Sequence, residues 1–460
     1  MTEEILQMQR EFFASGKTAD ISFRKRSLMM LHKEISAMTD EILDALHEDL
    51  GKSRHEGYMC EVGLALSEIR STVRHLRSWS RPRKARTPLS LFPGKSRIYP
   101  SPYGNVLIMS PWNYPFLLCI SPLISAVAAG NTAVVKPSAY SPATSAVVEK
   151  LIGKVFRPEH VTVAKGGRDV NTDLLERKFD YIFFTGSKAV GRIVMEKAAA
   201  HLTPVTLELG GKSPAIVHCD ADLQTGARRI VFGKFLNCGQ TCVAPDLIFV
   251  HEDVADRFIG LCKDEIVRMY GAEPLGNGSY GKIVNRKHFD RLSAALEECR
   301  ANVVYGGRTD AETLKIEPTL IRLSEERGDA LALMRDEIFG PLMPILTYRD
   351  IDEVARYIES HPRPLAAYFF TRNGKLADRL VRGLRFGGGC VNDTIIHLAT
   401  ENMPFGGVGE SGMGHYHGKY GFDTFSHLKS IVRKGAWPDP DMRYQPYTAL
   451  KSRLVKMFLK

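Results

Sequence analysis

The stretch NVLIMSPWNYPFLLCISPLISAVAAGNTAVVK, residues 105–136, decides the fold. It begins with a short apolar run at 105–109, continues with a long apolar segment at 117–129, and ends with a second short run at 132–136. Short apolar runs of this length predict buried strands, and the longer segment predicts a helix. A repeated strand-helix-strand pattern predicts a parallel sheet that is covered by helices on both faces.

The same alternation continues along the chain. Further strands are expected at 161–164, 181–184, 215–218, 247–250, 343–346 and 366–370, and further helices at 142–155, 188–200, 222–237, 254–270, 287–300 and 351–359. The fold class is therefore α/β, with two doubly wound lobes and a small β element, an extended arm or hairpin, outside them. The expected parts are a first lobe at 1–80 and 103–206, a second lobe at 207–400, the small β element at 81–102 and 420–440, and a C-terminal tail at 441–460.

Composition is that of a basic globular protein. The 460 residues are 44% apolar and 25% charged, and the formal net charge is +10. The excess is local, in residues 81–86 and in the last ten residues, and no nucleic-acid-binding module accompanies it, so no nucleic-acid partner is expected. The N-terminus lacks the features of a signal peptide, and no apolar run is long enough for a transmembrane segment. A cytoplasmic location is the expectation.

The eight cysteines are scattered and form no CxxC pair, which favours free thiols in a reducing compartment and no metal site. Of the eight, Cys242 is the candidate for a reactive thiol, since it lies in the glycine-flanked loop GQTCVAPD at 239–246. A thiolate is a strong nucleophile, although a free thiol has a pKa of about 8.5 and needs activation. The alternative is an inert buried cysteine, the usual fate of this residue.

Two polar residues could assist such a thiol. Glu208 lies between apolar neighbours in LELGG at 207–211, where partial burial would raise its pKa and suit a general base. The alternative is an ion pair with Lys212. Asn113 is held in a stiff segment between two prolines and could donate to a developing oxyanion, unless its amide only bonds the backbone of its own turn.

Two strand ends are candidates for binding a nucleotide. FTGSKAVG at 184–191 joins a strand directly to a helix, whose free N–H groups would suit a pyrophosphate. Taken alone, an ordinary turn with a serine cap is the better interpretation. Lys136 ends another strand, where it could bind a ribose or phosphate or remain a solvated lysine. Two such positions on neighbouring strands favour a nucleotide crevice.

Together these segments resemble the aldehyde dehydrogenase superfamily, and its class 3 branch most closely. The likeness extends over nearly the whole chain and includes PWNYP at 111–115, EIFGP at 337–341, PFGGVG at 404–409 and SGMGHYHGK at 411–419. It implies that the first lobe binds a dinucleotide and that the second is catalytic. It also implies a homodimer, in which the arm at 81–102 and a strand at 427–434 form a bridging, or oligomerisation, element that reaches a second subunit.

The resemblance also implies roles for single residues. Cys242 would be the nucleophile and Glu208 the base, and Asn113 with the Cys242 backbone N–H would form the oxyanion hole. The implied cofactor-binding residues are Lys136 and Ser138 at the adenosine ribose, Gly186, Ser187 and Gly191 at the pyrophosphate or adenosine, and Glu337 and Phe339 at the nicotinamide ribose and ring.

The implied reaction is the NAD(P)-dependent oxidation of an aldehyde to a carboxylic acid through a thiohemiacetal and a thioester. Medium or long aliphatic, or aromatic, aldehydes are the substrates this branch suggests. Relatives often have Lys-Pro-Ser-Glu where this chain has Ala139, which removes an NAD-selecting carboxylate, so NADP is expected to be accepted alongside NAD. A cofactor-free cysteine hydrolase or esterase is the alternative, and no clear Cys-His motif supports it.

Two further features are weakly determined. Tyr58, Tyr114, Phe235 and His397 are candidates for the substrate entry, although apolar side chains of this kind equally suit packing. In the tail, residues 447–460 carry apolar residues on one side and basic residues around them. A helix docked on the body is the favoured interpretation, and a peripheral contact with a membrane surface is the alternative.

Overall fold

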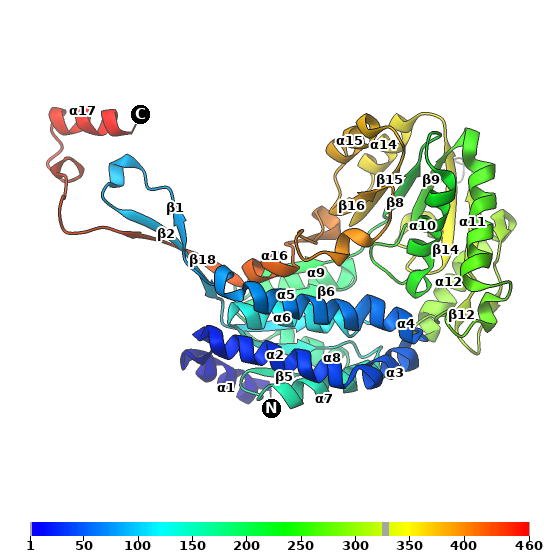
Figure 1. Cartoon of the computed structure of the whole chain (residues 1–460), viewed down its shortest axis with the longest axis horizontal. Coiled ribbons are helices and arrows are strands. Elements are labelled where there is room, and N and C mark those ends of the chain that lie inside the picture. Colours follow the sequence, from blue (N-terminus) through cyan, green and yellow to red (C-terminus); the bar gives the residue numbers. More distant parts are fainter. Residues whose placement is uncertain (1, 324–330, 460) are drawn as a thin grey trace.

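The computed structural model describes residues 2–323 and 331–459. It contains two open sheets, each packed between helices, and an arm that projects from one side (Figure 1). The predicted α/β class with two doubly wound lobes is confirmed.

The first sheet has six strands in the order β17-β7-β6-β3-β4-β5. All neighbours are parallel except β17, which pairs antiparallel with β7. The strands are β3 (Asn105–Met109), β4 (Thr132–Lys136), β5 (Val161–Val163), β6 (Tyr181–Thr185), β7 (Val205–Glu208) and β17 (Gly412–Met413). Every residue of β3, β4 and β6 is buried, as the continuous apolar runs predict for a sheet covered on both faces.

Alternate residues of β3 enter two different cores. Val106 and Ile108 pack in the core that includes α2, α3, α5, α6 and α7, whereas Leu107 and Met109 pack in the core that includes α1, α8 and α9. The first set of helices is α2 (Ile21–Ala37), α3 (Thr39–Leu50), α5 (Gly63–Trp79), α6 (Leu117–Ala129) and α7 (Pro142–Val155). The second set is α1 (Thr2–Ala14), α8 (Arg168–Leu175) and α9 (Lys188–Ala199).

The second sheet has seven strands in the order β10-β13-β14-β9-β8-β15-β16, and only β10 runs antiparallel to its neighbour. The strands are β8 (Pro214–Val217), β9 (Leu247–His251), β10 (Val303–Tyr305), β13 (Thr319–Leu323), β14 (Leu342–Tyr348), β15 (Ala366–Phe370) and β16 (Gly388–Val391). Its helices are α10 (Leu223–Phe235), α11 (Ala255–Tyr270), α12 (Arg286–Glu298), α13 (Ala332–Arg335), α14 (Ile351–Ser360) and α15 (Gly374–Gly383). A small hairpin, β11 (Thr309–Asp310) with β12 (Lys315–Ile316), lies beside it.

Side-chain caps explain where several helices begin. The Ser187 hydroxyl accepts the backbone N–H of Val190 at the start of α9, and Asp222 accepts that of Thr225 at the start of α10. The sequence pattern missed α1, because only Leu6 and Gln9 of this amphipathic helix are fully buried. Gln9 fixes α1 to the sheet through the carbonyl of Ala133, which its side-chain amide reaches at 3.0 Å.

The predicted boundary between the lobes, at 206/207, falls inside β7. The chain also returns to the first sheet late, through β17 and α16 (Gly418–Thr424), which packs against α5 and α6. The division into a dinucleotide-binding and a catalytic lobe stays a prediction.

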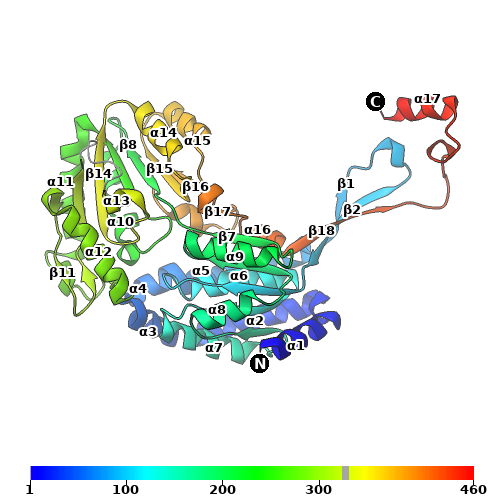
Figure 2. The same cartoon turned by 180° about the vertical axis from the view of Figure 1, so that it is seen from behind.

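The arm is a three-stranded antiparallel sheet in the order β1-β2-β18. It consists of β1 (Arg83–Ala85), β2 (Lys95–Pro102) and β18 (Ser426–Arg433), so the expected hairpin is present and the late strand pairs with it. Figures 1 and 2 both show this sheet pointing away from the two lobes.

The C-terminal helix α17 (Ala449–Phe458) lies at the far end of the arm. The expectation that it docks on the body is wrong, because the chain leaving β18 follows the arm outward instead of turning back. Leu450, Met457 and Leu459 remain exposed there. None of the helices in residues 2–323 and 331–459 has the length and apolar character needed to cross a membrane.

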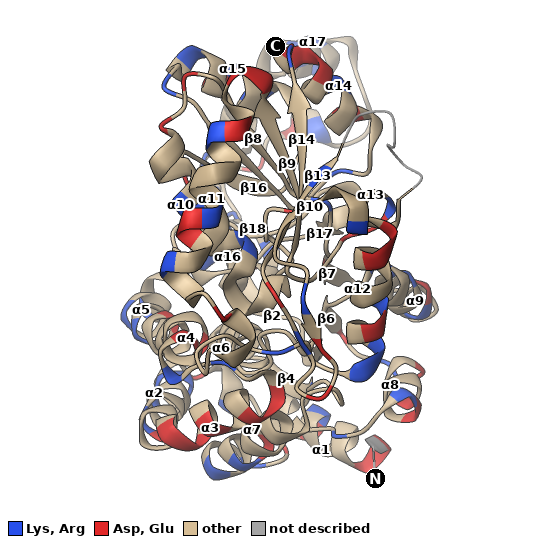
Figure 3. Cartoon of the chain, turned by 90° about the vertical axis from the view of Figure 1, so that its right-hand side faces the viewer, with Lys and Arg blue, Asp and Glu red and all other residues tan. Residues whose placement is uncertain are grey.

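Charged residues of both signs are spread along the outer helices, whereas the central strands carry few (Figure 3). This is the distribution that buried sheets between solvated helices require.

Candidate active site

Cys242 lies where two cavities meet. The larger, of about 600 Å³, opens between the carboxyl ends of the strands of the first sheet and the amino ends of the strands of the second, and the smaller, of about 210 Å³, is mainly apolar. Cys242 lines both, and of the other residues in the described chain only Leu118 does so. A reactive group placed here can meet one molecule from each side.

The thiol of Cys242 is held protonated by its surroundings. Burial raises its pKa well above the usual range, and the nearby carboxyls of Glu337 and Glu208 raise it further. The backbone N–H groups of Cys242 and Val243 act in the opposite direction. Formation of the thiolate therefore depends on what else enters the cavity and on a group that takes the proton.

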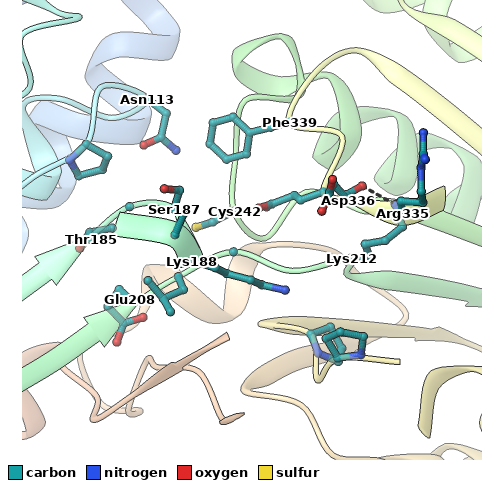
Figure 4. A pocket seen from close by; sticks show the side chains of 18 of the residues that line it. Asn113, Thr185, Ser187, Lys188, Glu208, Lys212, Cys242, Arg335, Asp336 and Phe339 are labelled. Carbon is teal, nitrogen blue, oxygen red and sulfur yellow. Dashed lines mark hydrogen bonds between the residues drawn. The ribbon is translucent and has the colours of Figure 1, made fainter. Parts of the chain in front are cut away.

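Glu208, the last residue of β7, is such a group. Its side chain is 2% exposed, and within the described residues neither carboxylate oxygen has a hydrogen-bond partner. Burial raises its pKa well above that of an ordinary glutamate. The alternative ion pair with Lys212 does not form, since the Lys212 ammonium donates to Asp246 Oδ2 at 2.6 Å. Figure 4 shows Glu208 and Cys242 at the same cavity.

Asn113 lies in the loop between β3 and α6 and lines the larger cavity. One N–H of its side-chain amide donates to the carbonyl of Gln240 at 3.0 Å. Its own backbone carbonyl accepts from Lys52 Nζ at 2.9 Å and from the side-chain amide of Asn237 at 2.8 Å. The amide retains a second N–H, and the loop is fixed from both sides relative to the cysteine loop.

A buried ion pair secures that loop. Lys52 and Glu61 have side chains that are 1% and 0% exposed, and Lys52 Nζ lies 2.6 Å from Glu61 Oε1. Glu61 Oε2 accepts the backbone N–H groups of Phe116 at 2.9 Å and Leu117 at 3.1 Å, at the start of α6. Glu61 belongs to a π-helical turn, Tyr58–Val62, between the short helix α4 (Arg54–Gly57) and α5. Such turns are frequent at functional sites.

The segment 336–339 closes the other side of the larger cavity. Lys212 Nζ donates to the carbonyl of Asp336 at 3.0 Å, and Asp246 Oδ1 accepts the backbone N–H of Ile338 at 3.1 Å. Glu337 is thereby pressed against Gly210, where an added Cβ would lie 1.8 Å from its carboxylate oxygen. Burial raises the pKa of Glu337 to about 8. A side chain at position 210 would displace this carboxyl from its present place.

The rim of the larger cavity is cationic. The residues that line it include Lys188, Arg192, Lys212, Arg291 and Arg335. The first turn of α9, which begins after Ser187, supplies backbone N–H groups and the positive end of a helix dipole at the same place. An anion with an apolar ring fits this lining, since Phe339 and Trp112 meet edge to face there at 5.3 Å.

The predicted cofactor residues are only partly brought together. Gly186, Ser187, Glu337 and Phe339 line the larger cavity, whereas Lys136, Ser138 and Gly191 do not. Lys136 is buried at the end of β4, and its ammonium donates to the carbonyl of Pro137 at 2.7 Å. Gly191 lies on α9 against Leu209, with room for no Cβ.

Of the four predicted entry residues, the structure places one in the smaller cavity. Tyr114 lines it, and the Tyr114 hydroxyl hydrogen-bonds Thr241 Oγ1 at 2.7 Å. Tyr58 is 48% exposed outside the lining, and Phe235 is buried against Tyr270. His397 lies behind the wall, where its ring approaches Phe405 at 6.0 Å.

Comparison with known proteins identifies the family of the chain. A sequence profile of the Aldehyde dehydrogenase family matches residues 2–431. The chain belongs to the aldehyde dehydrogenase family. The predicted family resemblance is thus confirmed.

Two curated relatives of this aldehyde dehydrogenase cover it almost end to end. The 4,4'-diaponeurosporen-aldehyde dehydrogenase of Staphylococcus aureus is 46% identical over 98% of this chain and 97% of its own length. Aldehyde dehydrogenase family 3 member H1 of Arabidopsis thaliana is 45% identical, over 97% of this chain and 92% of its own length.

Solved structures agree with the fold. A substrate-bound AldH of Staphylococcus aureus superimposes with a TM-score of 0.97, at 44% identity and 100% coverage of both chains. An NAD+ complex of a Bacillus cereus aldehyde dehydrogenase has a TM-score of 0.83 at 25% identity, over 93% of this chain and 88% of that one. An NADP complex of GapN, a glyceraldehyde-3-phosphate dehydrogenase from Methanocaldococcus jannaschii, has a TM-score of 0.82 at 25% identity, over 94% and 93%.

Sequence reasoning missed several residues of the aldehyde dehydrogenase site. Lys52 and Glu61 lie in a region of ordinary helical pattern, and no local signal marks them as partners of a loop some fifty residues later. Lys212 follows LELGG and Asp246 ends GQTCVAPD, so their place beside or in these motifs was the available signal. Among the described residues, no group of three or more histidine, cysteine or acidic side chains is arranged to hold a metal ion.

Proposed function

We propose that Cys242 carries out the aldehyde oxidation of this family at the junction of the two cavities, with NAD(P) in the larger one and the aldehyde chain in the smaller. The observation that carries the proposal is the position of one thiol between a cationic cleft and an apolar pocket. A cofactor-free cysteine hydrolase has no use for the cationic cleft.

The chain's own residues can perform the steps as follows. Cys242 loses its proton, with Glu208 as the unpaired carboxyl that can accept it, and the sulfur attacks the carbonyl carbon. The resulting oxyanion is stabilised by the free N–H of the Asn113 amide and by the Cys242 backbone N–H. Bound NAD(P) supplies a hydride acceptor. After it has released the first proton to solvent, Glu208 takes a proton from a water molecule, and the resulting hydroxide attacks the thioester and displaces the Cys242 thiolate, which gives the acid.

The residues of the cleft fit the cofactor in two ways. The basic side chains and the α9 N-terminus suit its phosphates, and Glu337 and Phe339 would hold the nicotinamide ribose and ring. We place Gly186 and Ser187 at the pyrophosphate, and Lys136, Ser138 and Gly191 toward the adenosine. Ala139 is exposed and offers no carboxylate to a ribose, so we propose that NADP is used alongside NAD.

The substrate is proposed from the smaller cavity, whose lining is mostly aliphatic and aromatic. Residues from α5, α6, α10 and the segment 395–399 contribute to it. A medium or long aliphatic, or an aromatic, aldehyde suits such a wall. The name of the Staphylococcus aureus relative, which specifies 4,4'-diaponeurosporen-aldehyde, supports an apolar chain.

We also propose that the arm holds a second copy of this chain. β18 is an edge strand with seven consecutive exposed residues, among them Leu428, Ile431 and Val432. A long unpaired edge of this kind favours pairing with another strand, and a homodimer closes it. A cytoplasmic location is proposed because all eight cysteines are free thiols.

The test is a panel of aldehydes of increasing chain length with NAD or NADP, followed by the absorbance of the reduced nicotinamide. Cys242→Ala should abolish oxidation, and Cys262→Ala, which removes a buried thiol of α11 that lines neither cavity, is the matched control. A labelled aldehyde adduct should be found on Cys242 by mass spectrometry. Acid formation without reduced nicotinamide, or an adduct on another side chain, would contradict the proposal.

A further inference from the structure

Two of the polar atoms in the wall of the smaller cavity are buried without a partner. Glu68 on α5 and Ser121 on α6 both line it, and their side chains are 7% and 1% exposed. Glu68 Oε1 and Ser121 Oγ make no hydrogen bond of normal geometry to any described residue, although Ser121 lies close enough to the Glu68 carboxyl to lower its pKa. Buried polar atoms normally have a partner, so two unpartnered atoms in one cavity wall require an explanation.

An ion pair within the protein does not provide it. Glu61, seven residues earlier, is neutralised by Lys52, but no lysine or arginine of the described chain lines the cavity around Glu68. Burial raises the pKa of the Glu68 carboxyl to about 7, although the Ser121 hydroxyl and the Gly418 backbone N–H act to lower it. His417, also in the wall, is neutral because burial lowers its pKa to about 4.

The two atoms complement one small group. A hydroxyl has one hydrogen to donate, which Glu68 Oε1 can accept, and it has lone pairs that can accept the Ser121 O–H. A methylene at the same place would leave both atoms desolvated and unpaired. Sites built to bind a hydroxyl discriminate strongly against analogues that lack it, because their buried polar groups then lose their partner.

We propose that Glu68 and Ser121 form a polar subsite in the aldehyde pocket that binds a hydroxyl group on the substrate chain, so that hydroxylated aldehydes are preferred over their unsubstituted parents. The inference rests on the proposed function of the same cavity. It adds a specificity that the apolar lining does not supply.

The experiment compares unbranched alkanals with their monohydroxylated counterparts, with the hydroxyl moved one carbon at a time, and with the ω-amino aldehydes. For the best hydroxyl position, kcat/KM in the wild type should exceed that of the parent alkanal by about tenfold or more. The ratio of the two values is the readout, so a general loss of activity in a variant does not affect it.

Three variants locate the preference. Ser121→Ala and Glu68→Met should each lower the ratio toward one, whereas Glu68→Gln, which retains a side-chain acceptor and donor, should keep most of it. Ser125→Ala is the matched control, because Ser125 is buried one turn further along α6 and lines neither cavity. Its ratio should equal that of the wild type.

Three outcomes overturn the inference: a wild-type ratio near one at every hydroxyl position, a ratio that both Ser121→Ala and Glu68→Met leave unchanged, or a preference for the amino aldehydes, which would mark a cation subsite. Failure of the proposed function looks different. In that case no aldehyde of the panel, including the parent alkanals, would reduce the nicotinamide.

Discussion

Replacing Lys52 by methionine tests whether the ion pair behind the Asn113 loop is structurally decisive. Methionine has a similar length and no charge, so the change leaves the Glu61 carboxylate in a site that is 0% exposed. It also removes the donor to the Asn113 carbonyl, 2.9 Å away, and a cation that lies 4.0 Å from the centre of the Tyr114 ring. The remaining donors to Glu61 are the two backbone N–H groups at the start of α6.

The expected loss is large because an unpaired charge is costly in a dry site. Removing one partner of a buried ion pair costs about 3–5 kcal/mol. For a lobe of this size, 1 kcal/mol corresponds to about 2–4 °C in Tm, so the apparent Tm should fall by roughly 6–20 °C. The turnover number should fall too, since the loop that presents the Asn113 amide loses one of its two anchors.

The chain contains a matched control. Lys150 and Glu41 form a pair of nearly the same length, 2.7 Å, but their side chains are 52% and 41% exposed. An exposed pair of this kind contributes about 0–1 kcal/mol, so Lys150→Met should lower Tm by about 4 °C or less. Burial, together with the lost contacts of Lys52 to Asn113 and Tyr114, then separates the two variants.

The assay is thermal unfolding followed by dye fluorescence, together with the half-life of activity at a fixed temperature. The double variant Lys52→Met/Glu61→Gln should recover part of the lost stability, because the buried charge is gone and the glutamine carbonyl can still accept from α6. Equal Tm losses for Lys52→Met and Lys150→Met would refute the reasoning. So would a double variant less stable than Lys52→Met alone.

Four further outcomes are expected. Glu208→Gln should form the acyl-enzyme and then stall, which gives a burst of reduced nicotinamide without steady turnover. In the wild type, burial raises the pKa of Glu208, and only the ionised form is a base, so deacylation should rise with pH up to that raised pKa, a rise that Glu208→Gln abolishes. Ala139→Glu should lower the NADP/NAD ratio of kcat/KM by about tenfold, because the new carboxylate repels the 2′-phosphate by ~1.4 kcal/mol. An unchanged ratio would show that residue 139 does not face the adenosine ribose. Ile431→Lys should convert a dimer to a monomer in sedimentation, and an intact dimer would show that the β18 edge is not the interface.

Sequence reasoning succeeded where the chemistry is local. The apolar runs at β3, β4 and β6 are buried on both sides, so their pattern alone specifies the sheet. Cys242 and Glu208 each lie in a short motif whose residues remain neighbours in space. Glu208 ends β7 of the first sheet and Cys242 precedes β9 of the second, so their meeting at one cavity depends on how the two sheets face each other, which the sequence pattern does not specify.

The rest depended on contacts between distant residues. Lys52 and Glu61 act on the loop that carries Asn113, but their sequence neighbourhood is an ordinary amphipathic helix. Phe235 was a reasonable entry residue by type, yet its position on α10 turns it toward Tyr270. The direction of α17 was decided by the path of the arm, which local periodicity does not encode.

The buried acids explain why the site requires its ligands to act. The thiol of Cys242 shares one desolvated cavity with Glu208 and Glu337, and each carboxylate raises the pKa of the thiol. Three like charges in a dry cavity are mutually unfavourable, so the groups do not all ionise in the empty cavity. A positive charge bound in the cleft favours ionisation of all three groups. The oxidised NAD(P) cofactor carries such a charge on its nicotinamide ring, and the basic rim attracts its phosphates. The nucleophile is therefore kept neutral until the cleft is filled, which protects the thiol from reacting before its partner is bound.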